Sequence, residues 1–179
     1  VEDVALASYG RSGEGWFSNT GLMNGFRAKA RSLGADFAVD EVVAIARDGD
    51  AVAAVTLASG RRVAAGTVVN ASGPRAALTA RMAGLDVPVE PRKRTMFVFD
   101  CANSPEGSAT VSGGRLPLMI DHNGVFCRPE GRHFLCGCPP VTDPAADWDD
   151  FEPRWDEFET IIWPTLAARS EAFEAIKLV

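Results

Sequence analysis

The stretch Thr67-Val-Val-Asn-Ala-Ser-Gly-Pro74 decides the fold class, because it changes from a strand pattern to a helical pattern within a few residues. Its first four residues predict a buried strand, the small residues Ala71, Ser72 and Gly73 follow, and a helical pattern then runs from Arg75 to Ala83. Proline is tolerated in the first turn of a helix, where its missing N–H would have no partner. Small residues at the carboxyl end of a strand let a ligand approach the backbone closely. We therefore expect a strand–turn–helix unit with a binding surface at residues 71–73.

The segments on both sides of this unit predict a mixture of strands and helices, which is typical of the α+β class. Upstream, Asn19 or Thr20 is expected to cap a helix that ends at Gly34. The apolar stripe of this helix consists of Leu22, Phe26, Ala30 and Leu33. Further strands are expected at 4–9, 37–45, 52–57, 62–65, 95–101, 116–120, 125–128 and 133–138. The three strands between 37 and 65 form a meander, and a last helix from Asp149 is ended or kinked by Pro164.

Composition narrows the class of protein. The chain has 179 residues, of which 46% are apolar and 23% charged, as in one soluble globular domain or two small lobes. No apolar run approaches the roughly 18 residues of a membrane span. The net charge of -6 argues against nucleic-acid binding, which usually requires a basic surface. The chain begins at Val1 rather than at a methionine, and we expect it to be a piece of a longer protein.

The four cysteines, Cys101, Cys127, Cys136 and Cys138, are interpreted as buried structural thiols, because they fall in predicted strands. A zinc site would usually show paired Cys-x-x-Cys motifs, whereas this chain has one Cys-Gly-Cys and two distant cysteines. We therefore expect no metal site. Unpaired thiols weakly favour a reducing compartment, and so a cytoplasmic location.

The loop Gly13-Glu-Gly15 offers the first two glycines of a dinucleotide-binding motif. The expected helix, however, starts several residues too late, and Trp16 and Phe17 would keep a pyrophosphate off the loop. We interpret it as a surface or substrate-facing loop.

Several motifs, in their order along the chain, resemble the central part of the D-amino-acid-oxidase-like flavoproteins. They are Gly15-Trp-Phe-Ser-Asn-Thr-Gly-Leu-Met23, Leu33-Gly-Ala35, the meander, Val68-Val-Asn-Ala-Ser-Gly-Pro74, Val87-Pro-Val-Glu-Pro-Arg-Lys-Arg94 and Gly124-Val-Phe-Cys-Arg-Pro-Glu-Gly131. That superfamily includes sarcosine and glycine oxidases and dimethylglycine dehydrogenases. The likeness is strongest to its FAD-dependent oxidoreductase-domain branch.

The resemblance implies a division of the chain and a cofactor. Residues 1–20 would contribute a strand and loop to a substrate lobe, 21–85 a partial FAD-binding lobe with the three-stranded meander, and 86–179 the rest of the substrate lobe. The substrate lobe would be built on a mixed β-sheet with C-terminal helices. FAD is the implied cofactor, with Val42 against the adenine and Ala71, Ser72 and Gly73 along the flavin nucleotide.

Two family segments are missing from residues 1–179. They are the N-terminal strand with its Gly-x-Gly-x-x-Gly loop, which holds the pyrophosphate, and the C-terminal segment that returns to the flavin ring. We expect this piece alone to bind FAD poorly or not at all, and to be inactive as an enzyme.

The candidate substrate residues each have two interpretations. Arg128 could bind a substrate carboxylate through a two-pronged charge-assisted contact, or it could reach solvent and pair with Glu130. Met96 and Trp16 could line a substrate pocket or belong to the core. The cluster Arg92-Lys93-Arg94 could face an anionic ligand or lie solvated at the start of a strand. No residue is assigned a catalytic role.

The function implied by the resemblance is oxidation of a C–N bond of a small-molecule amine or amino acid by hydride transfer to FAD. Leu135 occupies the position where the sarcosine-oxidase branch has a lysine, so methylamine oxidation of that type is not expected. Two alternatives remain: an assembly or scaffolding factor with a flavoprotein fold, and a self-contained α+β binding module.

Overall fold

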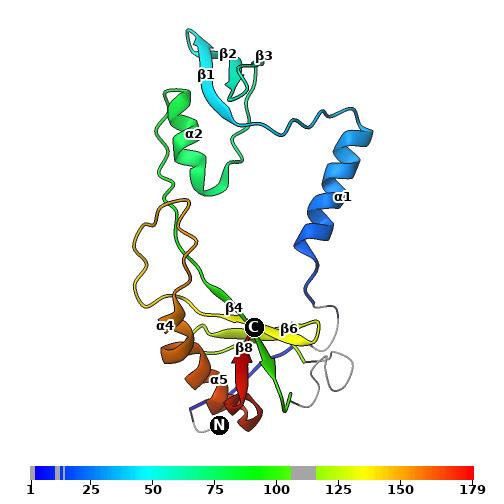
Figure 1. The fold of residues 1–179 in the computed structure, drawn as a ribbon, viewed down its shortest axis with the longest axis vertical. Coiled ribbons are helices and arrows are strands. Elements are labelled where there is room, and N and C mark those ends of the chain that lie inside the picture. The colour runs from blue at the N-terminus through cyan, green and yellow to red at the C-terminus, as the bar shows by residue number, and fades with distance from the viewer. Residues whose placement is uncertain (1–2, 11–12, 14, 106–115) are drawn as a thin grey trace. The chain divides into compact units, whose positions relative to one another are not determined.

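The computed structural model describes residues 3–10, 13, 15–105 and 116–179, and the chain divides into two compact units (Figure 1). The sheet unit comprises Val1–Trp16, Lys93–Asp143 and Phe151–Val179, and the meander unit comprises Phe17–Arg92 and Pro144–Asp150. Helices and two antiparallel sheets together confirm the α+β class. The expected lobe boundaries after residues 20 and 85 stay predictions.

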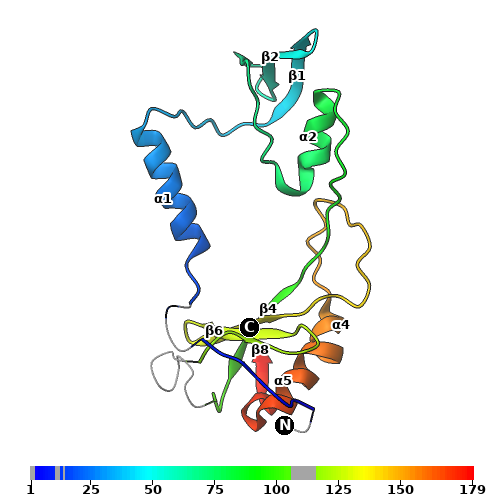
Figure 2. The ribbon, with the colours of Figure 1, turned by 180° about the vertical axis from the view of Figure 1, so that it is seen from behind.

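The sheet unit is built on a five-stranded antiparallel sheet with the strand order β5-β6-β7-β4-β8. Figure 2 labels its strands β4, β6 and β8. Its strands are β4 (Met96–Cys101), β5 (Met119–Ile120), β6 (Phe126–Glu130), β7 (His133–Gly137) and β8 (Ile176–Leu178). Four of the five were expected within a few residues, whereas β8 was not. The strand expected at 4–9 is wrong, since no ladder forms there.

Four consecutive helical segments cover one face of this sheet. They are α4 (Trp155–Glu157), the π-helical turn η2 (Phe158–Ile162), α5 (Trp163–Arg169) and the short 3-10 helix η3 (Glu171–Glu174). Pro164 lies in the first turn of α5, directly after η2. A proline ring clashes with the preceding turn and lacks an N–H, which accounts for the widened turn before it. The expected start at Asp149 is wrong, because the helix begins at Trp155.

The core of the sheet unit lies between the sheet and these helices. Phe99 stacks on Phe134 with ring centroids 5.3 Å apart, and Phe173 meets both rings edge-on at 5.9 and 5.5 Å. Ile162 and Leu166 are fully buried against them. This aromatic cluster fixes which face of the sheet is internal.

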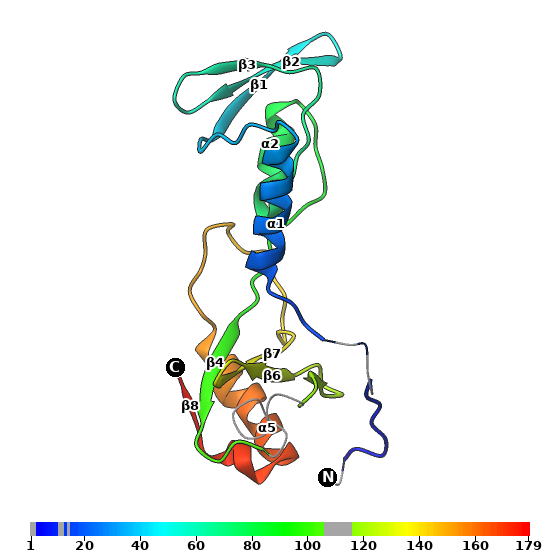
Figure 3. The same cartoon turned by 90° about the vertical axis from the view of Figure 1, so that its right-hand side faces the viewer.

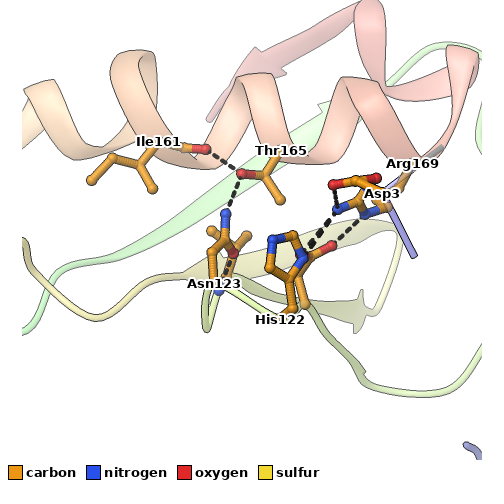
Figure 4. Close-up of polar contacts among 8 residues, drawn as sticks. Asp3, His122, Asn123, Ile161, Thr165 and Arg169 are labelled. Atoms are coloured by element: carbon orange, nitrogen blue, oxygen red, sulfur yellow. Dashed lines mark hydrogen bonds and ion pairs between the residues drawn. The ribbon is translucent and has the colours of Figure 1, made fainter. Parts of the chain in front are cut away.

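Arg169 at the end of α5 ties the N-terminal segment to the sheet unit (Figure 4). Its guanidinium forms ion pairs with the carboxylates of Asp3 and Asp121, and the side chain of Asp121 is almost fully buried. The hydrogen bond from Arg169 lowers the pKa of Asp121 below its ordinary value. Nearby, Asn123 Nδ2 donates to Thr165 Oγ1 over 2.9 Å, so the loop before β6 is also attached to α5.

The meander unit contains a three-stranded antiparallel sheet with the order β1-β2-β3 (Figure 3). Its elements are α1 (Asn19–Ser32), β1 (Val42–Asp48), β2 (Ala51–Leu57), β3 (Arg62–Ala64), the 3-10 turn η1 (Gly73–Arg75) and α2 (Ala76–Met82). The expected meander is confirmed. Ser18, rather than Asn19 or Thr20, caps α1, because its Oγ accepts a hydrogen bond from the Gly21 N–H over 3.0 Å. Gly34 has the expected positive φ of 91°.

Two apolar segments of the meander unit do not pack as their patterns predict. None of the residues of α1 is buried, although Leu22, Phe26 and Leu33 form the expected apolar stripe. The strand expected at 67–70 does not form, and Val69 is 84% exposed. A strand requires a hydrogen-bonded neighbour, and the described residues place none beside this segment. Both patterns therefore mark apolar surface that remains uncovered within the described chain.

The helices of the described ranges include none that is long and apolar enough to cross a lipid bilayer.

Candidate functional site

The sheet unit has an open face on the side away from the helical layer. Successive side chains of a strand point to opposite faces, and the register places Arg128 opposite Leu135 and Leu135 opposite Val98. Next to these residues on the same face, Gly137 lies opposite Phe126 on one side and opposite Met96 on the other. Met96 is 55% exposed, in contrast to the buried Phe97 beside it. These six residues define the open face used below.

Gly137 creates the apolar part of the open face. A Cβ added there would lie 2.8 and 2.9 Å from the ring carbons Cζ and Cε1 of Phe126, and 3.2 Å from the carbonyl oxygen of Thr95. Contacts below 3.0 Å do not occur, so only glycine lets the Phe126 ring take this position. Phe126 and Met96 thus flank a strand position that has no side chain.

Arg128 provides the positive charge of the open face. Its guanidinium carbon lies 5.0 Å from the centre of the Trp16 ring, in cation–π contact. Its Nη1 donates to the carbonyl oxygen of Pro129 over 3.0 Å and pairs with the Glu130 carboxylate. The expected pairing with Glu130 is therefore present, and the structure also brings Trp16 to Arg128. Within the described part of the chain, the polar contacts of Arg128 involve its Nη1 atom.

The four cysteines are buried and free, as expected. Burial raises the pKa of the Cys127 thiol to about 12 and that of the Cys138 thiol to about 11. Burial likewise raises the pKa of Cys136. Such thiols are protonated at neutral pH and are poor nucleophiles and poor metal ligands. The described residues contain no group of three or more metal-ligating side chains.

The expected cofactor residues of the meander unit lie on two segments, the first of which is the turn at residues 71–73. Asn70 supports this turn from both ends, since its Nδ2 donates to the Ala76 carbonyl oxygen over 2.9 Å and its Oδ1 accepts from the Ser72 N–H over 3.2 Å. Gly73 has a φ of +55°, and an added Cβ would meet nothing within 4 Å. The Asn70 side chain thus fixes the turn, whereas no described atom covers the Cβ position of Gly73. Small residues with uncovered backbone fit the close approach of a nucleotide.

Val42 begins β1 on the second segment and is half-buried. The Asp40 carboxylate accepts a hydrogen bond from Ser59 Oγ over 2.6 Å, and this contact lowers the pKa of Asp40. The Glu41 carbonyl oxygen accepts from the Ala58 N–H over 2.7 Å. These bonds fix the backbone just before Val42.

The basic cluster is engaged within the chain. Arg92 pairs with Glu90 over 2.6 Å, and Arg94 forms a two-pronged ion pair with Asp143, with both N–O distances at 2.7 Å. Lys93 Nζ donates to the Glu152 carbonyl oxygen over 3.0 Å. The side-chain contacts of Lys93 and Arg94 thus fasten segments that are distant in sequence.

Comparison with known proteins assigns the family. The model of the family described as FAD dependent oxidoreductase matches residues 3–176, nearly the whole chain. The chain belongs to the FAD dependent oxidoreductase family. Its members depend on FAD, which confirms the cofactor class implied by the sequence motifs. The interpretation as a binding module unrelated to flavoproteins is therefore wrong.

Named relatives align with nearly the whole length of this chain. It is 33% identical over 206 residues to FAD-dependent oxidoreductase domain-containing protein 1 of Xenopus laevis, covering 98% of this chain and 40% of that protein. It is 31% identical to the Bos taurus protein of the same name, covering 99% of this chain and 42% of that protein. The chain thus spans about two fifths of the length of these relatives.

Solved structures of low sequence identity support the fold. L-proline dehydrogenase from P. horikoshii matches with a TM-score of 0.71 at 20% identity, over 88% of this chain and 40% of that one. Iminodiacetate oxidase from Chelativorans sp. BNC1 matches with a TM-score of 0.58 at 18% identity, with the same coverage.

Three residues that bear on the candidate site were missed by the sequence analysis. Phe126 alternates with Arg128 along β6, so strand periodicity could have placed it on the open face. Arg75 and Trp148 lie 4.4 Å apart, from guanidinium carbon to ring centre. Their separation along the chain left no pattern that sequence reasoning could use.

Proposed function

We propose that the protein containing this chain oxidises a C–N bond of an amine or amino acid, with FAD as the acceptor of the hydride equivalent. The family assignment supports an FAD-dependent oxidoreductase, and two proteins of similar fold are by name an L-proline dehydrogenase and an iminodiacetate oxidase. Bound flavin would supply the redox chemistry, whereas the protein would bind and orient the substrate.

The observation that carries the proposal is the open face of the sheet unit. It combines one positive charge, on Arg128, with the apolar side chains of Phe126, Met96 and Leu135. An amino acid presents a carboxylate and a hydrocarbon portion, and these match a guanidinium beside an apolar surface. Trp16 holds the guanidinium from one side, so the charge is partly oriented before a carboxylate binds.

In the meander unit, Val42 and the turn at Ala71, Ser72 and Gly73 are the residues that we propose to contact FAD. The uncovered turn and the fixed backbone before Val42 support this role. The cytoplasmic location stays a prediction.

The experiment uses the full-length protein. We expect it to purify with flavin absorbance, and we expect the flavin to bleach under anaerobic conditions when an amine or amino acid from a panel is added. A full-length protein that takes up no flavin on reconstitution contradicts the proposal. A flavin that binds but is not reduced by any member of the panel favours the assembly or scaffolding role instead.

A further inference from the structure

Arg75 connects the two segments that carry the proposed cofactor residues. It is the last residue of η1, whose first residue is Gly73. Its Nη2 forms an ion pair with Glu41, the residue directly before Val42. A single side chain therefore links the turn at 71–73 to the start of β1. The Arg75 side chain is 35% exposed, so this link is only partly shielded from water.

Trp148 supports Arg75 from a segment that lies far along the chain. The guanidinium carbon of Arg75 is 4.4 Å from the centre of the Trp148 ring, well within cation–π distance. A planar guanidinium can stack on an aromatic face and still pair with a carboxylate at its edge. Arg75 uses both interactions, with Trp148 on its face and Glu41 at its edge.

The segment that carries Trp148 is fastened to the meander unit by its backbone as well. Arg92 and Ala145 form an antiparallel β-bridge, and the Ala146 N–H donates to the Pro91 carbonyl oxygen over 3.0 Å. Residues 144–150 belong to the meander unit, although the residues on both sides of them belong to the sheet unit. The short segment 144–150 thus places Trp148 beside Arg75, and the backbone of its first residues is bonded to residues 91 and 92.

We propose that Trp148 is a positioning residue for the flavin nucleotide, acting through Arg75 on the Ser72–Gly73 turn and on the backbone before Val42. The inference rests on the proposed function, because it assumes that these two segments contact FAD. Without the Trp148 ring, the Arg75 guanidinium keeps its ion pair with Glu41 but is no longer held in one orientation. The two segments that it links are then less well aligned. Flavin binding then has to restore that alignment, which weakens the affinity.

The test compares flavin affinity and thermal stability in the full-length protein. Trp148→Ala should weaken the Kd for FAD by about two- to fivefold, the range expected for one partly exposed cation–π contact. Trp148→Phe keeps an aromatic face and should stay near the wild-type Kd. The Tm of the flavin-free protein should be nearly unchanged in both variants, while the rise in Tm on adding saturating FAD should be smaller in Trp148→Ala.

Two further variants separate positioning from general damage. Trp155→Ala removes a half-exposed tryptophan from the sheet unit and should leave the Kd for FAD unchanged. Arg75→Met combined with Trp148→Ala should weaken the Kd by less than the product of the single effects, because both act through one contact.

The outcomes are distinguishable. If wild-type protein binds FAD and Trp148→Ala has the same Kd, the positioning role is overturned and the proposed function stands. The positioning role is also overturned if Trp148→Ala lowers the Tm of flavin-free and flavin-bound protein equally without changing the Kd. Wild-type protein that binds no FAD overturns the proposed function, and the positioning role with it.

Discussion

Arg128 is held on the open face by two groups of different kinds, the Trp16 ring and the Glu130 carboxylate. The ring orients the guanidinium without using its N–H donors, whereas Glu130 uses the Nη1 edge. The Glu130 side chain is half-exposed, and the Arg128 side chain is 19% exposed. A carboxylate that binds Arg128 would therefore meet a charge that the ring and Glu130 already orient.

The Arg128→Met variant tests this role. We expect the apparent KM for carboxylate-bearing substrates to rise by on the order of tenfold or more, because one charge-assisted contact is lost. The KM for amines without a carboxylate should change little. Steady-state kinetics of the full-length protein give both values. Arg132→Met, in the turn after β6, is the matched control, and an equal rise in KM in that variant would contradict the assignment.

Gly137 makes a second prediction at the scale of single residues. Gly137→Ala should lower the free energy of unfolding by about 1–3 kcal/mol, because the added Cβ overlaps the Phe126 ring and approaches the Thr95 carbonyl oxygen. Chemical denaturation measures this change. Gly15→Ala is the control, since a Cβ at Gly15 meets nothing within 4 Å and its φ is not positive. Similar losses in both variants would show that the Phe126 contact is not the cause.

Among the elements, strands β6 and β7 carry buried thiols that make stability depend on alkaline pH. The pKa of Cys127 is raised to about 12, so this thiol stays protonated in the folded protein while an unfolded thiol ionises near its ordinary pKa of about 8.5. Stability is therefore fully present below that ordinary pKa and is lost as the pH rises toward 12.

We expect the urea midpoint to fall between pH 8 and pH 10, and to fall less in Cys127→Ala than in the wild type. Comparing the two proteins removes the contributions of other groups that titrate in this range. An identical decline of the urea midpoint in both proteins would exclude the Cys127 thiol as a cause.

In the native protein, the thiols of Cys127, Cys136 and Cys138 should react slowly with a thiol reagent at pH 7.5, and rapidly after unfolding.

The element patterns explain what sequence reasoning could and could not predict. Strands β4, β6 and β7 were predictable because their alternating side chains bury one face. Segment 67–70 has the composition of a buried strand, but a strand also needs a neighbour, which its own residues cannot specify. The π-helical turn before Pro164 follows from the proline itself, which was visible in the sequence. The start of α4 at Trp155, rather than at Asp149, had no such local signal.

For the candidate site, the local placement of residues was predictable from the sequence, but the contacts between distant residues were not. The strand placement of Arg128 and Met96 follows from periodicity, and the bare turn at Gly73 follows from residue size. The contacts of Arg128 with Trp16 and of Arg75 with Trp148 join residues far apart in the chain. Such contacts are set by the tertiary fold and leave no local signal.

At the scale of the whole molecule, the pair of Asp121 and Arg169 ties the loop between β5 and β6 to the end of α5. We expect Asp121→Asn to lower the Tm by about 5 °C at pH 7, because it breaks an ion pair whose carboxylate is almost fully buried. The lowered pKa of Asp121 means that this stabilisation is present above the ordinary carboxyl pKa of about 3.9 and is lost as the pH falls below it.

Calorimetry at several pH values checks this prediction, and the difference in Tm between wild type and Asp121→Asn should shrink below about pH 4. Asp3→Asn serves as the control, because the side chain of Asp3 is 55% exposed and should matter less. A difference in Tm that stays constant down to pH 3 would rule out the titration of Asp121 as its source.

The path of the chain between the two units has a consequence for folding during synthesis. The contact between Asp3 and Arg169 spans 166 positions, so the first segment of the sheet unit emerges from the ribosome long before its partner. The meander unit likewise receives Trp148 only after β4, β6 and β7 have been made. Contacts of such large sequence separation slow folding. The meander unit therefore cannot be completed before residues 93–143 of the sheet unit have been translated, and premature release at residue 92 would leave both units unfinished.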